Sequence, residues 1–145
     1  MKKIVLIAAL LAATALQPGW AAEKAKTAAC PPAGAREAEA AIRYMTDLMI
    51  VSSTCQDTVY GEFRARNRDA IMGYQKAMAA HLRGNAAFDK WNTSLANQAA
   101  QKNAGNQQLC VQSAALLQQA KAMDARGFKA YAVQAASTGS PSCGK

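Results

Sequence analysis

The sequence predicts an all-α protein, an up-down four-helix bundle stapled by two disulfides. Apolar residues recur at steps of three and four along four segments, which is the pattern of amphipathic helices. Only seven valines and isoleucines follow residue 21, too few to favour an all-β domain. Alanine, with 35 residues, is the largest single contributor to the apolar fraction of 51%. We therefore expect a lean core in which the helices pack closely and covalent staples add stability.

Length and charge narrow the class of protein. A chain of 145 residues corresponds to about one domain, which excludes a multidomain enzyme. The formal net charge is +8, which excludes a disordered acidic tail and gives weak attraction to anionic partners. The basic residues are scattered along the chain, so we expect no nucleic acid as a partner.

The first 21 residues have the pattern of a Sec-type signal peptide. Lys2 and Lys3 precede an apolar run, and the small residues Gly19 and Ala21 stand at −3 and −1 of a cleavage site after residue 21. The run of about 13 residues is shorter than the roughly 20 that span a bilayer. We expect residues 1–21 to be removed and the mature chain to be periplasmic or secreted, with no stable membrane insertion.

The helical domain is expected to cover residues 35–136, between a flexible lead-in over 22–34 and a C-terminal tail over 137–145. The first helix is predicted over about 35–56. A second helix is expected to begin at an N-cap formed by Asp57-Thr58, and its apolar positions continue to Leu82.

The second half of the domain is expected to hold two more helices. The third covers about 85–102 and ends in the loop Asn103-Ala104-Gly105-Asn106. The fourth begins near Gln107 and continues to about residue 136, with Gly127 as a candidate break. Short loops between successive helices favour antiparallel neighbours, hence an up-down bundle.

Four cysteines define the expected staples. An even number in an exported chain favours disulfides. The pairs Cys30–Cys55 and Cys110–Cys143 would each have to bridge a helix about 30 Å long, which a disulfide cannot do. Joining Cys30 to Cys110 would connect opposite ends of the bundle. The remaining pairing is Cys30–Cys143 with Cys55–Cys110, and the absence of C-x-x-C excludes thioredoxin-like exchange and c-type haem attachment.

Residues for catalysis are sparse. His81 is the only histidine. It lies near the end of the second predicted helix, where a protonated histidine would complement the negative end of the helix dipole. There is no G-x-S-x-G, P-loop or H-E-x-x-H motif. The methionines recur at helical spacing, which is typical of core filling. The sequence therefore predicts a non-catalytic protein with no catalytic residues, no metal and no cofactor.

The second helix carries the candidate partner contact. It combines aromatic residues with the densest basic stretch of the chain, and both kinds are enriched at the centres of protein interfaces. The candidate residues are Tyr60, Phe63, Arg64, Arg66 and Arg68. In the alternative interpretation the rings belong to the core and the arginines only solubilise the surface.

Three short motifs carry a resemblance to a known group. They are the segment 48–55, which reads LMIVSSTC, the segment 93–97, which reads TSLAN, and Leu109-Cys110. Over about residues 40–120 the chain resembles small secreted helical proteins of unknown function, mostly alphaproteobacterial, with a Leu-Met…Cys helix, a Thr-x-Leu-Ala-Asn helix and a second Cys. The resemblance implies no catalytic residues, and it agrees with the pairing Cys55–Cys110.

These observations lead to two functional expectations. The first is an exported non-catalytic helical protein that binds a protein or a surface component of the cell envelope. The alternative is a carrier that holds a small apolar ligand or haem in the core of the bundle. An enzyme would need a cleft with perturbed carboxylates, which a sequence does not reveal.

Overall fold

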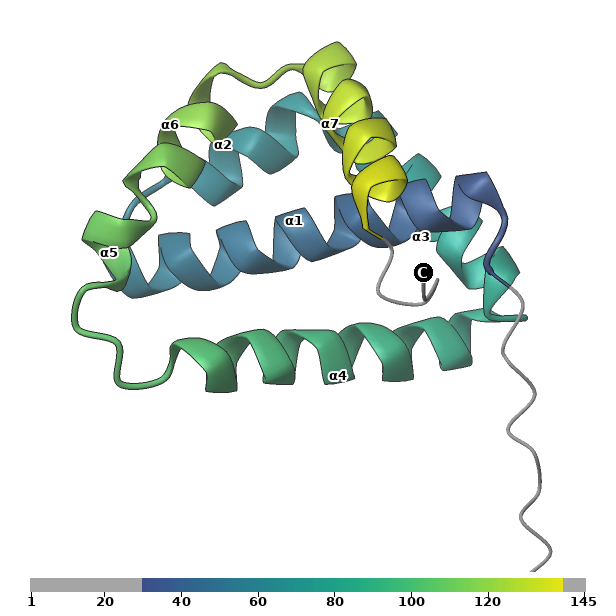
Figure 1. Ribbon diagram of the computed structural model, residues 1–145, viewed down its shortest axis with the longest axis horizontal. Coiled ribbons are helices and arrows are strands. Elements are labelled where there is room, and N and C mark those ends of the chain that lie inside the picture. Colours follow the sequence, from purple (N-terminus) through teal and green to yellow (C-terminus); the bar gives the residue numbers. More distant parts are fainter. Residues whose placement is uncertain (1–29, 140–145) are drawn as a thin grey trace, which may run out of the picture.

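The computed structural model describes residues 30–139, and all regular secondary structure in this range is helical (Figure 1). The predicted all-α class is confirmed. The expected signal peptide over 1–21 and most of the expected tail lie outside the described residues. The helices are α1 (Ala33–Cys55), α2 (Val59–Arg66), α3 (Arg68–His81), α4 (Asn85–Asn103), α5 (Leu109–Gln112), α6 (Ala114–Ala122) and α7 (Ala125–Thr138).

Helix α1 lies at the centre of the fold and contacts each of the other six helices. In Figure 1, α1 and α4 run in the same direction, α2 and α3 run back, and α7 crosses α1. The predicted first helix is confirmed to within two residues at each end. The helix ends at Cys55, and the next residue, Gln56, adopts the left-handed conformation (φ 55°, ψ 41°) and donates its backbone N–H to carbonyls of the last turn.

The second predicted helix is broken into α2 and α3 at Asn67, so the expectation of one continuous helix is wrong. The Asn67 side chain is 1% exposed. Its Nδ2 donates to the carbonyl of Phe63 at 3.0 Å and to that of Met123 at 3.2 Å. An asparagine that bonds to nearby backbone groups competes with helix continuation. The break therefore sits where this side chain ties the second segment to a distant one.

The fourth predicted helix is divided into α5, α6 and α7, whereas the third is confirmed as α4. The expected break at Gly127 lies instead at Met123-Asp124. There Asp124 is the N-cap of α7 and its side chain accepts a hydrogen bond of 2.8 Å from the Gly127 N–H. The described residues thus form seven helices where the sequence pattern predicts four.

The core consists of two clusters that share α1. The larger one joins α1 to α2, α3, α6 and α7 around Phe63 and Phe128, both 0% exposed. The smaller one joins α1 to α3 and α4 around Ile42, Met78 and Leu95. Alanines with no exposed surface lie at the helix contacts and permit the close packing expected from the composition: Ala38, Ala41, Ala120 and Ala132.

A disulfide joins Cys55, the last residue of α1, to Cys110 on α5, with a Cα–Cα distance of 5.6 Å. This half of the predicted pairing is confirmed. Cys143 lies outside the described residues, so Cys30–Cys143 stays a prediction. Within residues 30–139, no helix is both long enough and apolar enough to cross a membrane.

Candidate functional site

A hollow with a volume of about 560 Å³ lies beside α2 and α3. We call it the arginine groove. Its apolar lining comes from Met45 of α1, Tyr60 of α2 and Met72 of α3, and its charged lining comes from Arg64 and Arg68. The groove thus combines an apolar surface with two cationic side chains.

The arginines of this groove are exposed and carry no compensating carboxylate. The guanidinium of Arg64 lies 5.6 Å from the centroid of the Tyr60 ring, a cation–π contact. Among residues 30–139, the only ion pair within 4.0 Å is that of Arg43 with Glu39. Two guanidinium groups of the groove are therefore available to a negatively charged partner.

Two of the five predicted contact residues, Phe63 and Arg66, lie outside the lining of the arginine groove. Phe63 is fully buried and packs edge-on against Phe128, with ring centroids 5.0 Å apart. Arg66 turns toward the C-terminal end of α6 and donates to the carbonyls of Ala120 and Met123. Phe63 therefore lies in the core and Arg66 is held by the end of α6, so neither side chain lines the groove. The other three predicted contact residues line the groove: Tyr60, Arg64 and Arg68.

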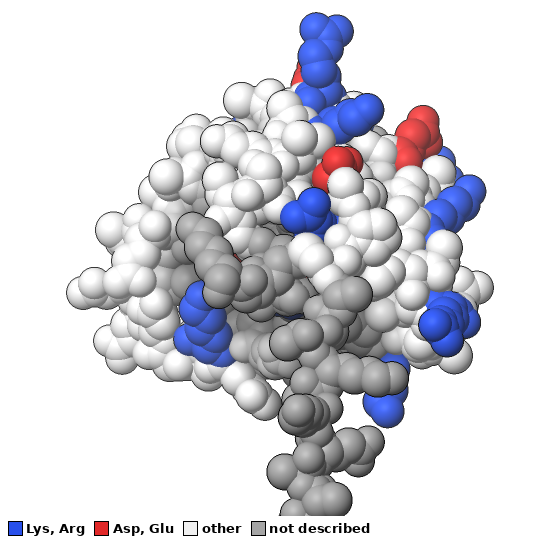
Figure 2. All heavy atoms as spheres, turned by 45° about the vertical axis from the view of Figure 1, so that its right-hand side comes forward, with Lys and Arg blue, Asp and Glu red and all other residues white. Residues whose placement is uncertain are grey.

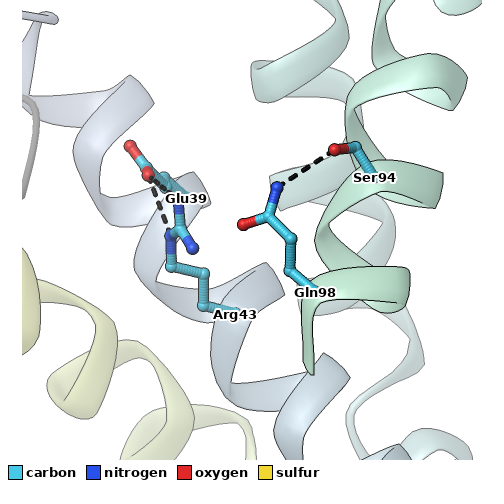
Figure 3. Close-up of polar contacts among 4 residues, drawn as sticks. All are labelled: Glu39, Arg43, Ser94 and Gln98. Atoms are coloured by element: carbon cyan, nitrogen blue, oxygen red, sulfur yellow. Dashed lines mark hydrogen bonds and ion pairs between the residues drawn. The ribbon is translucent and has the colours of Figure 1, made fainter. Parts of the chain in front are cut away.

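A second, smaller hollow of about 140 Å³ lies between α1 and α7. It is lined by Arg36, Glu39, Arg43 and Tyr131, among others. Glu39 and Arg43, one turn apart on α1, form a contact of 2.8 Å that neutralises both charges (Figure 3). Beside them, Gln98 of α4 donates to Ser94 on its own helix. Among the polar side chains that line this hollow, Glu39 and Arg43 satisfy one another, whereas the buried Nε of Arg36 has no hydrogen-bond partner.

The described residues contain no group of three or more His, Cys, Asp or Glu side chains that could hold a metal ion. His81 is the exposed last residue of α3. The Tyr44 phenol is buried, its hydroxyl has no hydrogen-bond partner, and burial followed by the neighbouring Tyr131 raises its pKa to about 12. A phenol with so high a pKa stays protonated at neutral pH.

On the face shown in Figure 2, lysines and arginines are spread instead of gathered in a single patch. The distinctive feature of the arginine groove is therefore its combination of cations with an apolar hollow. Met72, at 38% exposed, is one of three large hydrophobic residues that are exposed within residues 30–139.

Sequence reasoning missed the methionines of the groove. Helical spacing predicts core positions for Met45 and Met72, and Met45 is indeed 8% exposed. Met72, one turn after Arg68 on α3, instead lines the groove and is 38% exposed. Periodicity does not distinguish these two methionines, because both lie at helical spacing.

Comparisons of the chain with protein-family models, with curated proteins and with solved structures find no match. The geometry of the groove is therefore the basis for a functional proposal.

Proposed function

We propose that this chain is an exported, non-catalytic helical protein that binds a protein or surface component of the cell envelope through the arginine groove. The observation that carries the proposal is the pair Arg64 and Arg68, unpaired with carboxylates and placed beside an exposed methionine and a tyrosine. Arginine, methionine and aromatic residues are the types enriched at protein interfaces.

Export is proposed on two grounds. Residues 1–21 have the pattern of a signal peptide. The Cys55–Cys110 disulfide is of a kind that persists in oxidising compartments and is rare in the cytosol. We place the protein in the periplasm or outside the cell, in the group of small secreted helical proteins that its motifs resemble.

The finer architecture forms part of the same proposal. The chain passes back and forth four times as an up-down bundle, with the second and fourth passes broken, and a second disulfide joins Cys30 to Cys143. Peptide mapping of the exported protein without reduction tests this bridge. A peptide that links Cys30 to Cys143 is expected, together with a new N-terminus at Ala22, and a link from Cys30 to any other cysteine contradicts the pairing.

Photocrosslinking in the native cell envelope tests the binding function. A photoreactive phenylalanine analogue replaces Met72 in the groove or, as a control, Val111 on α5, which is 81% exposed. We expect a defined adduct from position 72, its loss when Arg64→Glu and Arg68→Glu are added, and no such adduct from position 111. Equal labelling from both positions, or none from position 72, refutes the proposal.

Absorbance of the purified protein distinguishes the alternative of a carrier. The two hydrophobic clusters are closely packed and the arginine groove lies at the surface, which favours docking over enclosure of a ligand. We expect a colourless protein. A Soret band would instead identify a haem carrier.

A further inference from the structure

The arginine groove continues into a third hollow, which lies along α3. Met72 and Gln75 line both hollows. This third hollow has a volume of about 370 Å³ and reaches Phe88 on α4. Together they form an extended groove that begins at Tyr60 on α2, follows α3 and ends at the start of α4.

The apolar lining of the extended groove suits a side chain from a partner. Met45, Ile71 and Phe88 contribute largely buried surfaces, while Met72 is partly exposed. Methionine side chains are flexible and polarizable, and they are over-represented at surfaces that adapt to partner helices. The accessible apolar surface of the extended groove is therefore centred on Met72, whose flexible side chain can adapt to the apolar face of a partner.

The charges along this strip are mainly positive. Arg64, Arg68 and Lys76 line it, against a single carboxylate on Asp89. Arg68 and Lys76 are eight residues apart on α3, which corresponds to about 12 Å along the helix axis. Acidic residues eight positions apart on a helix lying along α3 would have the same spacing.

We propose that the extended groove binds an acidic amphipathic helix of another protein, a refinement that rests on the binding function proposed above. An amphipathic helix can lay its apolar face in such a groove while its acidic side chains meet the cations. The described residues contain no strand, so this part of the chain offers no sheet edge to an extended peptide. The concave, mixed surface also differs from the basic amphipathic helix that lies in a membrane surface.

A displayed library of 18-residue amphipathic helices tests this inference. The apolar face is fixed as leucine, and the flanking polar positions are randomised among Glu, Gln and Lys. Selection on the full chain is expected to enrich Glu at positions four and eight residues apart. Enrichment of Lys, enrichment of no residue type, or no binding helix at all would overturn the inference.

Charge reversal locates the binding of the selected helix. Fluorescence anisotropy should show affinity about tenfold or more weaker for the double variant Arg64→Glu with Arg68→Glu, because like charges then face each other. The matched control is Lys121→Glu with Lys129→Glu, which changes net charge equally at exposed positions on α6 and α7. An equal loss of affinity in both variants contradicts binding in the groove.

Two further outcomes separate this inference from the general binding function. Vesicles containing phosphatidylglycerol that bind through Arg64 and Arg68, when no helix is enriched, would assign the groove to lipid and overturn the helix. An adduct from position 72 that depends on the arginines, together with failure of the library, would retain the binding function and reject an acidic helix. Absence of any adduct from position 72 when both arginines are present rejects the binding function itself.

Discussion

The guanidinium of Arg66 on α2 donates a hydrogen bond of 3.1 Å to the backbone carbonyl of Met123, which follows α6. Its Nη2 also donates to the carbonyl of Ala120 at 2.8 Å, and the Nδ2 of Asn67 shares the Met123 acceptor at 3.2 Å. Carbonyls at the C-terminal end of a helix lack partners within the helix. Two adjacent side chains thus cap α6 and hold the break between α2 and α3 against the turn that precedes α7.

Replacement of Arg66 tests this cap. Arg66→Ala removes two hydrogen bonds from a charged donor, and we expect a loss of about 2 kcal/mol in the free energy of unfolding. Urea denaturation measures the loss. Arg64→Ala is the matched control, because Arg64 is exposed and belongs to the groove, and its effect should stay within about 0.5 kcal/mol. Equal effects of the two substitutions would contradict a capping role for Arg66.

A double-mutant cycle tests the shared acceptor. Because Arg66 and Asn67 both donate to Met123, the variant Arg66→Ala with Asn67→Ala should depart from the sum of the single effects by about 0.5 kcal/mol or more. Additive effects would show that the two side chains act independently of the Met123 carbonyl.

The same two residues show how far the sequence predicts the fold. Periodicity identifies α1 and α4 nearly to the residue, because each carries an apolar face without interruption. Arg66 and Asn67 lie in an equally periodic segment, and nothing local distinguishes an exposed arginine from one that caps a helix 54 residues away in sequence. The break follows from tertiary contacts, which outweigh local propensity.

The candidate site was predictable in part for a similar reason. Composition identifies α2 as the segment that combines arginines with aromatic residues, and Arg64 and Arg68 do line the groove. Tyr60 and Phe63 both belong to the apolar repeat of the second predicted helix, but Phe63 is fully buried with Phe128 whereas Tyr60 lines the groove. Which ring is buried depends on the position of α7, and that position is set by contacts between segments far apart in sequence.

The buried hydroxyl of Tyr44 predicts a stabilising substitution. The side chain is 3% exposed and its hydroxyl has no hydrogen-bond partner. A buried polar group without a partner is costly, so Tyr44→Phe should raise the free energy of unfolding at pH 7 by about 1 kcal/mol. The ring contact with Tyr131, at 4.6 Å between centroids, is retained in the variant. Thermal unfolding measures the gain, and a lower melting temperature would contradict this account.

Tyr44 also predicts a dependence of stability on alkaline pH. Burial raises its pKa in the folded protein from 10.0 to about 12. Between pH 10 and pH 12 the unfolded chain releases the Tyr44 proton more readily than the folded protein does. The contribution of the protonated Tyr44 to the free energy of unfolding is therefore complete below pH 10 and is lost as pH rises toward 12. Tyr44→Phe should therefore show a shallower decline of the urea midpoint over that range. A decline parallel to that of the parent protein would refute the assignment to Tyr44.

The Cys55–Cys110 disulfide is expected to stabilise the fold and to hold α5 in place. It closes a sequence separation of 55 residues, and a loop of that size corresponds to about 4 kcal/mol of unfolded-state entropy. Helix α5 has four residues, of which only Leu109 is buried, so it has little packing of its own. Cys55→Ala with Cys110→Ala should lower the urea midpoint and raise hydrogen exchange most strongly around α5. The control, Ser53→Ala with Val111→Ala, alters exposed neighbours of the bridge and should leave both measurements nearly unchanged. Unaltered exchange at α5 in the cysteine variant would show that packing, without the bridge, fixes this end of α1.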